Sequence, residues 1–134
     1  MATWSAGLSV GVEAIDAQHQ QLFTRADALL EAMRSGESRA QVKPLIDFLR
    51  DYCNQHFASE ARLMAVERYP RREQHVLEHG EFTSRLGRIE ASFEAFGATT
   101  AIATEVHELL CVWFVRHVVE VDKALAVHLR RLPD

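Results

Sequence analysis

The stretch QHVLEH, residues 74–79, places His75 and His79 four residues apart, with Val76 and Leu77 between them. In an α-helix, residues four apart lie on the same face, so both imidazoles fall on one stripe of a predicted helix. Burying two imidazoles costs free energy unless their ring nitrogens find partners. The pair therefore indicates a polar site that uses both rings, and the rest of the chain shows what accompanies them.

The composition is that of an ordinary globular protein. The chain has 134 residues, 48% of them hydrophobic and 25% charged, which suits one domain with a substantial core. The net charge of −4 provides no basic surface for a phosphate backbone, so we expect no nucleic-acid partner. The longest apolar run, LLCVWFV at 109–115, is too short to cross a bilayer, so we expect no membrane insertion.

The N-terminus and the cysteines favour a cytoplasmic protein. The start, MATWSAGLSV, lacks the basic and apolar regions of a signal peptide. Cys53 and Cys111 lie far apart without a CxxC pattern, which is typical of reduced thiols rather than of a disulfide framework. We therefore expect a cytoplasmic location, and a monomer.

Glycine, proline and capping residues divide the chain into four long segments with helical periodicity. The first runs from Asp16, a candidate N-cap, to Ser35, with Gly36 as a stop signal. The second starts at Ser38, with Gln41 three residues later as a capping-box partner. These signals predict helices over 16–35 and 38–67.

The third and fourth segments complete the predicted fold. The third begins at Pro70, a favourable first helical residue, and ends before Gly97. The fourth follows Thr99 or Thr100 and runs towards Arg131. Short connections make neighbouring helices antiparallel. The sequence therefore predicts an all-α fold, an up-down-up-down four-helix bundle, as a single domain over 1–134 with an N-terminal arm at 1–15 and the bundle at 16–131.

All four predicted helices carry imidazole or carboxylate groups, and on the second, third and fourth helices histidines stand in line with the apolar stripe. The residues are His19 in AQHQ, His56 and Glu60 in HFASE, His75 and His79 in HVLEH, and His117 and Asp122 in HVVEVD. One histidine on an apolar face is usually a hydrogen-bonded core residue, but pairs on three helices argue against that reading. A metal is the natural compensation inside the bundle, because it uses imidazole lone pairs and carboxylate charge together.

The spacing of His117 and Asp122 predicts a break in the fourth helix. Asp122 comes five positions after His117, which places the two about 140° apart on an ideal helix. Glu120 would face the site better if the helix were straight. A wide turn near 118–122 would instead bring Asp122 inward, and such π-type turns often mark functional sites.

Two other features suggest chemistry but have simpler interpretations. HELLC at 107–111 begins like the zinc-protease motif HExxH, but Cys111 stands where the second histidine is needed, so His107 is expected to be a partly exposed residue. Cys53 lies on the same side as His56 and is expected to fill the core, where free cysteine is common.

At this point the chain resembles the hemerythrin family, specifically its single-domain bacterial members, the bacteriohemerythrins. The resemblance covers nearly the whole chain and rests on an arm with Trp4, W…LSVGVEAIDAQH, then on HFASE…LM…YP, the two histidines of the third segment, and W…H….D. It implies two oxo- or hydroxo-bridged iron ions. His19 and His56 would bind one iron, His75, His79 and His117 the other, and Glu60 and Asp122 would bridge both. Ala61 departs from the family, which often has a second glutamate there that is not a ligand.

The implied ligand set leaves one coordination position open. Five imidazoles, two bridging carboxylates and one bridging oxygen make eleven bonds, whereas two octahedral irons offer twelve positions. The vacancy falls on the iron with two histidines. The resemblance therefore implies reversible dioxygen binding for storage, delivery or sensing, with an oxygen-using enzyme as a candidate partner. Trp113 and Phe114 are expected to line a dry oxygen pocket, with Phe114 where the family commonly has leucine.

Two alternatives stay open at this stage. One is a di-iron enzyme that reduces peroxide or nitric oxide, and the other is iron storage or detoxification. Carboxylate-rich di-iron enzymes use Glu-x-x-His motifs on two helices, whereas no glutamate in this chain has histidine three residues later. Five neutral imidazoles favour Fe(II) and disfavour high-valent states, so we expect a binding protein rather than an enzyme.

Overall fold

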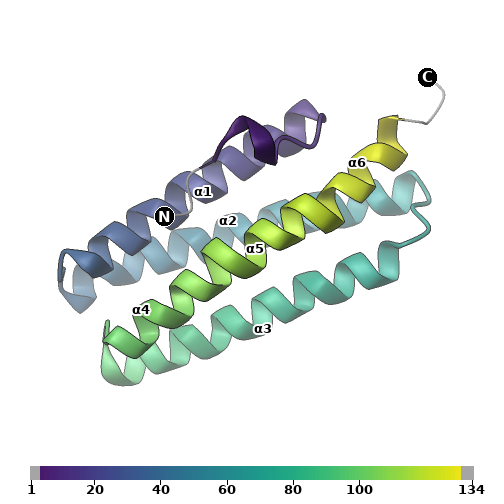
Figure 1. The fold of residues 1–134 in the computed structure, drawn as a ribbon. Coiled ribbons are helices and arrows are strands. Elements are labelled where there is room, and N and C mark those ends of the chain that lie inside the picture. Colours follow the sequence, from purple (N-terminus) through teal and green to yellow (C-terminus); the bar gives the residue numbers. More distant parts are fainter. Residues whose placement is uncertain (1–3, 131–134) are drawn as a thin grey trace.

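The computed structural model describes residues 4–130, with Ala6 described by its backbone alone, and it is helical throughout apart from short connections (Figure 1). A 3₁₀ turn, η1 (Ala6–Leu8), precedes three long helices, α1 (Glu13–Arg34), α2 (Arg39–Val66) and α3 (Arg72–Phe96). The fourth rod is one continuous helix of five segments, α4 (Thr100–His107), η2 (Glu108–Trp113), α5 (Phe114–Arg116), η3 (His117–Asp122) and α6 (Lys123–Arg130).

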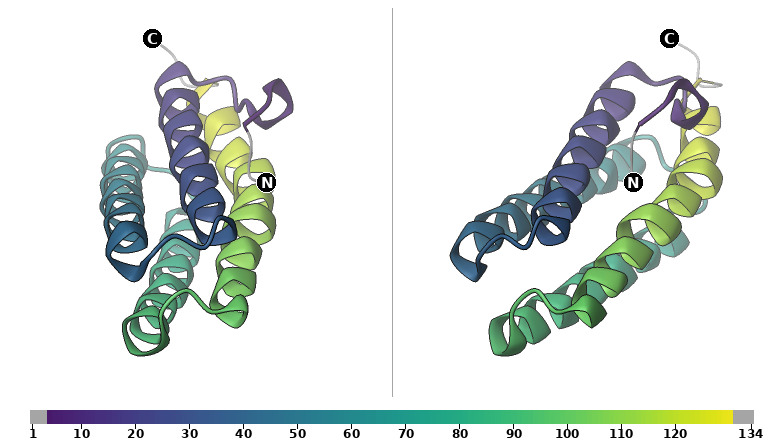
Figure 2. Two further views of the ribbon diagram at one scale, coloured as in Figure 1. Left: turned by 90° about the vertical axis from the view of Figure 1, so that its left-hand side faces the viewer. Right: turned by 60° about the vertical axis from the view of Figure 1, so that its left-hand side comes forward.

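The four rods form a closed bundle. Helix α1 packs against α2, α2 against α3, α3 against α4, and α4 against α1. Successive rods run in opposite directions, and the N-terminal segment lies beside the end of the bundle that holds α6 (Figure 2). Lys123 Nζ donates to the carbonyl of Gly7 at 3.3 Å, and the Arg130 guanidinium donates to the carbonyl of Val10. The predicted all-α four-helix bundle with an N-terminal segment is confirmed. None of the helices among residues 4–130 has the length and apolar character needed to cross a bilayer.

The caps of the first connection follow the sequence signals. The Ser38 side chain accepts from Gln41 N, and the Gln41 side chain accepts from Ser38 N, which is the predicted capping box. Gly36 has a φ of 72°, and its N–H and that of Glu37 bond to the carbonyls of Met33 and Ala32. This pair of bonds is a Schellman motif, which ends α1 where Gly36 predicted it.

Two helix starts differ from the prediction. Helix α1 begins at Glu13, three residues before Asp16, because the Asp16 carboxylate instead accepts from Val10 N at 2.8 Å and from Ser9 Oγ at 2.6 Å. The bundle therefore starts inside the predicted arm. Helix α3 begins at Arg72 rather than at Pro70, since residues 69–72 form a turn closed by Arg72 N on the carbonyl of Tyr69. Arg131, the predicted end of the fourth segment, lies outside the described residues.

The turn between α2 and α3 stores local backbone strain at Arg68. Its φ is 53°, the left-handed region that favours glycine. Arg68 N and Tyr69 N bond to the carbonyls of Ala65 and Met64, so this is a second Schellman motif with arginine at the glycine position. Tyr69 packs with Met64 and Leu125, the apolar contact that accompanies the motif. The turn thereby holds Tyr69 over the end of the bundle that contains His75, with the two rings 6.4 Å apart.

We expect Arg68→Gly to stabilise the protein. The substitution removes the steric cost of the left-handed conformation but adds chain entropy to the unfolded state, so the net gain should be about 0.5–1 kcal/mol. Urea unfolding followed by circular dichroism measures it as a higher midpoint with an unchanged slope. Arg68→Ala keeps the strain and should give no such gain.

The core is apolar along most of the bundle and polar in one layer. The largest fully buried apolar side chains include Phe23, Phe82, Leu29, Leu49 and Leu109. Among the described residues, the buried histidine, acidic and basic side chains number seven, and they are the seven predicted site residues. The core therefore surrounds a single polar layer.

The fourth rod contains the predicted wide turn. Segment η3 is a π-helix over His117–Asp122, and Leu125 beyond it is fully buried. Asp122 is buried, whereas Glu120 is exposed. The predicted break, with Asp122 rather than Glu120 facing inward, is therefore confirmed. A second π-segment, η2, precedes it and was not predicted.

Candidate metal centre

The seven predicted site residues meet in one layer of the bundle interior. Helix α1 contributes His19, α2 contributes His56 and Glu60, α3 contributes His75 and His79, and η3 contributes His117 and Asp122. None is more than 5% exposed. Each helix turns its ligand-type side chains inward because they continue its apolar stripe, which the hydrophobic effect buries.

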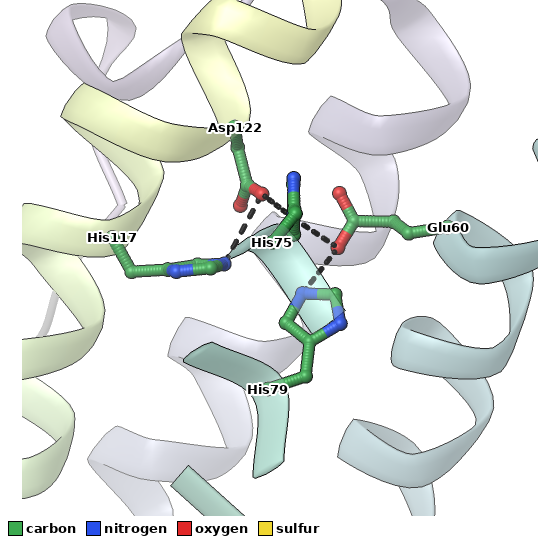
Figure 3. A group of neighbouring side chains, drawn as sticks. All are labelled: Glu60, His75, His79, His117 and Asp122. Atoms are coloured by element: carbon green, nitrogen blue, oxygen red, sulfur yellow. Dashed lines mark ion pairs between the residues drawn. The ribbon is translucent and has the colours of Figure 1, made fainter. Parts of the chain in front are cut away.

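The first group has three histidines and two carboxylates, His75, His79, His117, Glu60 and Asp122 (Figure 3). One potential ligand atom from each lies within 4.8 Å of all the others. Asp122 Oδ1 lies 3.1 Å from His75 Nε2 and 3.2 Å from His117 Nε2. Glu60 Oε1 lies 3.2 Å from His79 Nε2. Three imidazole nitrogens therefore converge on one space between the carboxylates.

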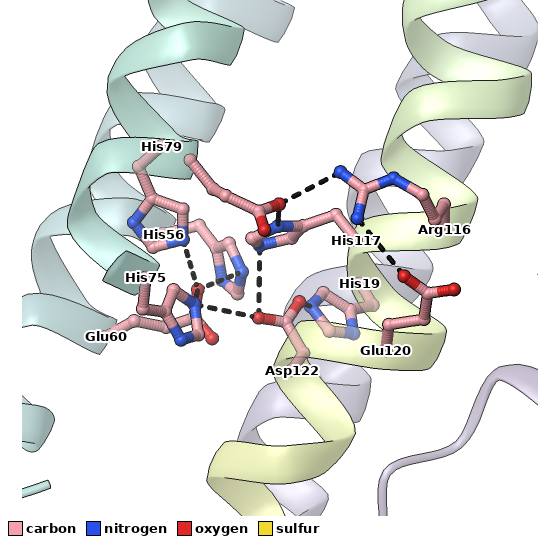
Figure 4. Close-up of polar contacts among 10 residues, drawn as sticks. His19, His56, Glu60, His75, His79, Arg116, His117, Glu120 and Asp122 are labelled. Carbon is pink, nitrogen blue, oxygen red and sulfur yellow. Dashed lines mark hydrogen bonds and ion pairs between the residues drawn. The ribbon is translucent and has the colours of Figure 1, made fainter. Parts of the chain in front are cut away.

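The second group has two histidines and the same two carboxylates, His19, His56, Glu60 and Asp122 (Figure 4). Asp122 Oδ2 lies 3.0 Å from His19 Nε2, and Glu60 Oε1 lies 3.2 Å from His56 Nε2. The two oxygens of Asp122 thus face different groups, Oδ1 the three-histidine group and Oδ2 the two-histidine group. A carboxylate in this position can bridge two metal ions.

The inward-facing atoms of these side chains are short of hydrogen bonds. Despite the close approaches, eleven of their side-chain atoms have no hydrogen-bond partner within the described part of the chain. Two are the Nδ1 atoms of His19 and His75, and the other nine are the Nε2 or carboxylate oxygen atoms of His19, His56, Glu60, His75, His79, His117 and Asp122. Leaving so many buried polar atoms unsatisfied is expensive. Imidazole nitrogens with carboxylate oxygens form a donor set suited to iron and other first-row metals. The residues therefore fit a two-metal centre.

Burial and neighbouring charges shift the pKa values of the cluster residues in opposite directions. Burial raises the pKa of Glu60 and Asp122, but the neighbouring histidines outweigh this effect and hold both pKa values below their usual range. Burial lowers the pKa of His75, yet Asp122 and Glu60 raise it to about 9. His79 behaves differently, because burial outweighs the carboxylates and its pKa is lowered. The carboxylates therefore outweigh burial at His75, and burial outweighs the carboxylates at His79.

This arrangement predicts how the stability of the metal-free protein depends on pH. A pKa of His75 raised from 6.5 to about 9 contributes stability that is fully present below pH 6.5 and is lost as the pH rises through 9. We therefore expect the free energy of unfolding of the metal-free protein to fall between these values. Metal binding requires the deprotonated ring, so metal affinity should rise over the same range. Urea unfolding at several pH values measures the first trend. A free energy that rises towards pH 9 would contradict it.

Sequence reasoning missed three residues that contact the site from outside. Gln18 Oε1 lies 2.6 Å from His56 Nδ1, and Glu78 Oε1 lies 3.0 Å from His117 Nδ1. Arg116 Nη2 donates to the same Glu78 oxygen at 3.0 Å. Gln18 and Glu78 immediately precede His19 and His79 in the sequence, but each forms its hydrogen bond with a histidine of another helix. Only the packing of the helices, and no spacing along the chain, reveals these pairs.

The two predicted pocket residues both pack against histidines of the cluster. The Phe114 ring lies 6.0 Å from that of His19, in the two-histidine group. The Trp113 ring stacks on His117 at 5.1 Å and 9°, in the three-histidine group. Both are buried. The Phe114 ring also lies 6.1 Å from that of His117, so Phe114 borders both groups, whereas Trp113 stacks on the three-histidine group.

The two features with simpler interpretations behave as expected. His107 is exposed. Cys53 is buried in the main core, and burial raises the pKa of its thiol well above the usual range. An inert thiol in the core agrees with its predicted packing role.

Comparison with known proteins adds an independent line of support. The family described as "Hemerythrin HHE cation binding domain" matches residues 10–129. The chain is 31% identical over 126 residues to the bacteriohemerythrin of Stenotrophomonas maltophilia, covering 94% of this chain and 80% of that protein. It is 28% identical to the bacteriohemerythrin of Methylococcus capsulatus, covering 92% of each chain. It is also 27% identical to the myohemerythrin of Riftia pachyptila, covering 89% of this chain and 86% of the other. With its helical bundle and its buried layer of histidines and carboxylates, the chain belongs to the hemerythrin family.

Proposed function

We propose that the chain is a non-haem di-iron protein that binds dioxygen reversibly at one open coordination position, for storage, delivery or sensing. The observation that carries the proposal is the division of seven buried side chains into two groups that share Glu60 and Asp122. The family supports a cation at this place, since its description names cation binding. Iron as that cation, and dioxygen as the ligand, are implied by the resemblance to hemerythrins.

The residues have distinct roles in this proposal. His19 and His56 hold one iron, while His75, His79 and His117 hold the other. Glu60 and Asp122 would be shared between the two irons, a role supported by the two oxygens of Asp122 facing different groups. When bound, the di-iron centre supplies the electrons with which dioxygen binds. Because the group of His19 and His56 offers one imidazole fewer than the other group, its iron would have the place for a small ligand.

Aromatic side chains would keep water away from that position. Phe114 is 3% exposed, and its ring packs edge-on against Phe23 at 5.5 Å and lies 5.7 Å from Phe82. Together they close the interior next to His19. A dry surrounding limits entry of protons and anions, which would otherwise release the reduced oxygen and leave the iron ferric. Trp113 shields the opposite group through its stacking on His117.

The test is a cycle of gas exchange on the reduced protein. Iron analysis should give two ions per chain. Absorption spectra recorded under argon, then oxygen, then argon should show a charge-transfer band that appears with oxygen and disappears when oxygen is removed. Direct conversion to the ferric state, without a reversible band, would replace the binding function with a di-iron enzyme. Iron in large excess of two per chain would indicate storage.

A further inference from the structure

Two of the five cluster imidazoles are held on their outer edge by side chains of different charge. Gln18 Oε1 faces His56 Nδ1 at 2.6 Å, and Glu78 Oε1 faces His117 Nδ1 at 3.0 Å. The Nδ1 atoms of His19 and His75, by contrast, have no hydrogen-bond partner among residues 4–130. The two-histidine group is thus supported by a neutral amide and the three-histidine group by a carboxylate.

These bonds decide which ring nitrogen faces the interior with its lone pair. A carboxylate oxygen and an amide oxygen accept, so the Nδ1 atoms of His117 and His56 must carry the protons. The lone pair of His117 then lies on Nε2, the atom 3.2 Å from Asp122 Oδ1. That of His56 lies on the Nε2 atom 3.2 Å from Glu60 Oε1. Both rings are therefore set as Nε2 ligands before a metal arrives.

The support of His117 is more elaborate than that of His56. Arg116 Nη2 binds Glu78 Oε1 at 3.0 Å, and Arg116 Nη1 binds Glu120 at 3.3 Å. The Arg116 guanidinium also lies over the Trp113 ring, 5.6 Å from its centre, and Trp113 stacks on His117. Figure 4 shows Arg116 between His117 and Glu120 on the outer side of the site. Glu78 on α3 is thereby fixed against the rod that carries His117.

We propose that Glu78, held by Arg116, is a positioning residue for His117, and that it makes the three-histidine position the tighter of the two metal positions. The inference rests on the proposed two-metal function. A hydrogen bond from a ligating imidazole to a carboxylate fixes the ring and increases its basicity. Hydrogen bonds to a charged acceptor are about twice as strong as those to a neutral one. The amide of Gln18 should therefore increase the basicity of His56 less than Glu78 increases that of His117.

The test is an anaerobic Co(II) titration of the metal-free protein, followed by visible absorption. The parent should bind two equivalents in two steps. Glu78→Gln should weaken the tighter step by about 10- to 100-fold and leave the other unchanged. Gln18→Glu, the reciprocal change, should strengthen the weaker binding step and so reduce the difference between the two Co(II) affinities. Glu81→Gln makes the same charge change at an exposed position of α3 and should titrate like the parent.

A second measurement separates positioning from a general effect on stability. In the Co(II)-loaded protein, the Nδ1 proton of His117 should give an exchangeable, paramagnetically shifted NMR signal. That signal should move in Glu78→Gln and stay in place in Glu81→Gln. A parent that fails to bind two Co(II) ions would overturn the proposed function itself. A parent that binds two, with Glu78→Gln titrating identically and the signal unmoved, would overturn the positioning role alone. So would a variant that weakens both steps equally and unfolds at a lower temperature.

Discussion

Replacing Asp122 with alanine is expected to lower the iron content from two ions per chain to less than one. Asp122 is fully buried, and its oxygens approach His19 on one side and His75 and His117 on the other. In the proposed centre it bridges both irons, so its loss removes one bond from each. Loss of a single terminal ligand, as in His117→Ala, should weaken chiefly the three-histidine position. Iron analysis by mass spectrometry after anaerobic loading measures both effects.

The controls for this prediction come from the same turn of helix. Glu120 is exposed and pairs with Arg116, so Glu120→Ala should keep two irons. Removing one member of a buried charge pair costs about 3–5 kcal/mol, so Asp122→Ala could lose iron through unfolding alone. Asp122→Asn preserves the shape of the side chain, and circular dichroism checks that it is folded. A folded Asp122→Asn variant that retains two tightly bound irons would contradict the bridging role.

The comparison of Asp122 with Glu120 also shows why this part of the site could be predicted from the sequence. A straight helix would have turned Glu120 inward, but an apolar position, Leu125, follows Asp122 at the right interval for a wide turn. The turn is present as η3. No comparable sequence pattern predicts the preceding π-segment, η2. Adjacent apolar residues such as Leu109–Leu110 and Trp113–Phe114 are both buried. An α-helix and a π-helix would each turn one member of such a pair to the core, so the pattern of apolar residues does not reveal the wider turn.

The polar layer was predictable because most of its residues lie on apolar stripes and a wide turn brings Asp122 to the same face, and the structure brings all seven together. Their assignment as iron ligands stays a proposal. The supporting residues were not predictable, because Gln18 and Glu78 bond across helices to His56 and His117. The helix starts were missed for a related reason. The Asp16 carboxylate accepts a hydrogen bond from the backbone of the arm instead of capping the helix. That bond depends on how the arm folds back on α1.

The ring of Phe114 closes the interior on the side of His19. The small apolar cavity beside it has room of only about 10 Å³ and is lined by Leu22, Phe23, Ala26, Leu49, Cys53, Phe82, Leu110 and Phe114. That volume is at the lower limit for one water molecule, and an apolar lining offers water no hydrogen bonds. The cavity is therefore dry. Removing the Phe114 ring, which lies 6.0 Å from the His19 ring, would enlarge the cavity towards His19 and leave room for water next to the proposed oxygen position.

We therefore expect Phe114→Ala to keep two irons but to autoxidise several-fold faster than the parent. The phenyl ring offers no ligand atom to a metal, so binding of the metal should survive. Water and anions admitted to the enlarged space would promote release of reduced oxygen and leave the iron ferric. The measurement is the decay of the oxygen-dependent absorption band in air, with iron content determined on the same samples.

Two further variants separate water access from loss of stability. Phe114→Ala should cost about 3–5 kcal/mol, because it leaves a cavity in the core. Phe114→Leu, which refills part of the space with the residue common in the family, should lose less stability and autoxidise at a rate between those of Phe114→Ala and the parent. Val112→Ala removes apolar atoms from an exposed site of the same rod and should change neither the stability nor the rate of autoxidation. If Phe114→Ala autoxidises at the parental rate while its stability falls as expected, exclusion of water by this ring does not protect the oxygen-bound state, and protection must come from the ligands themselves.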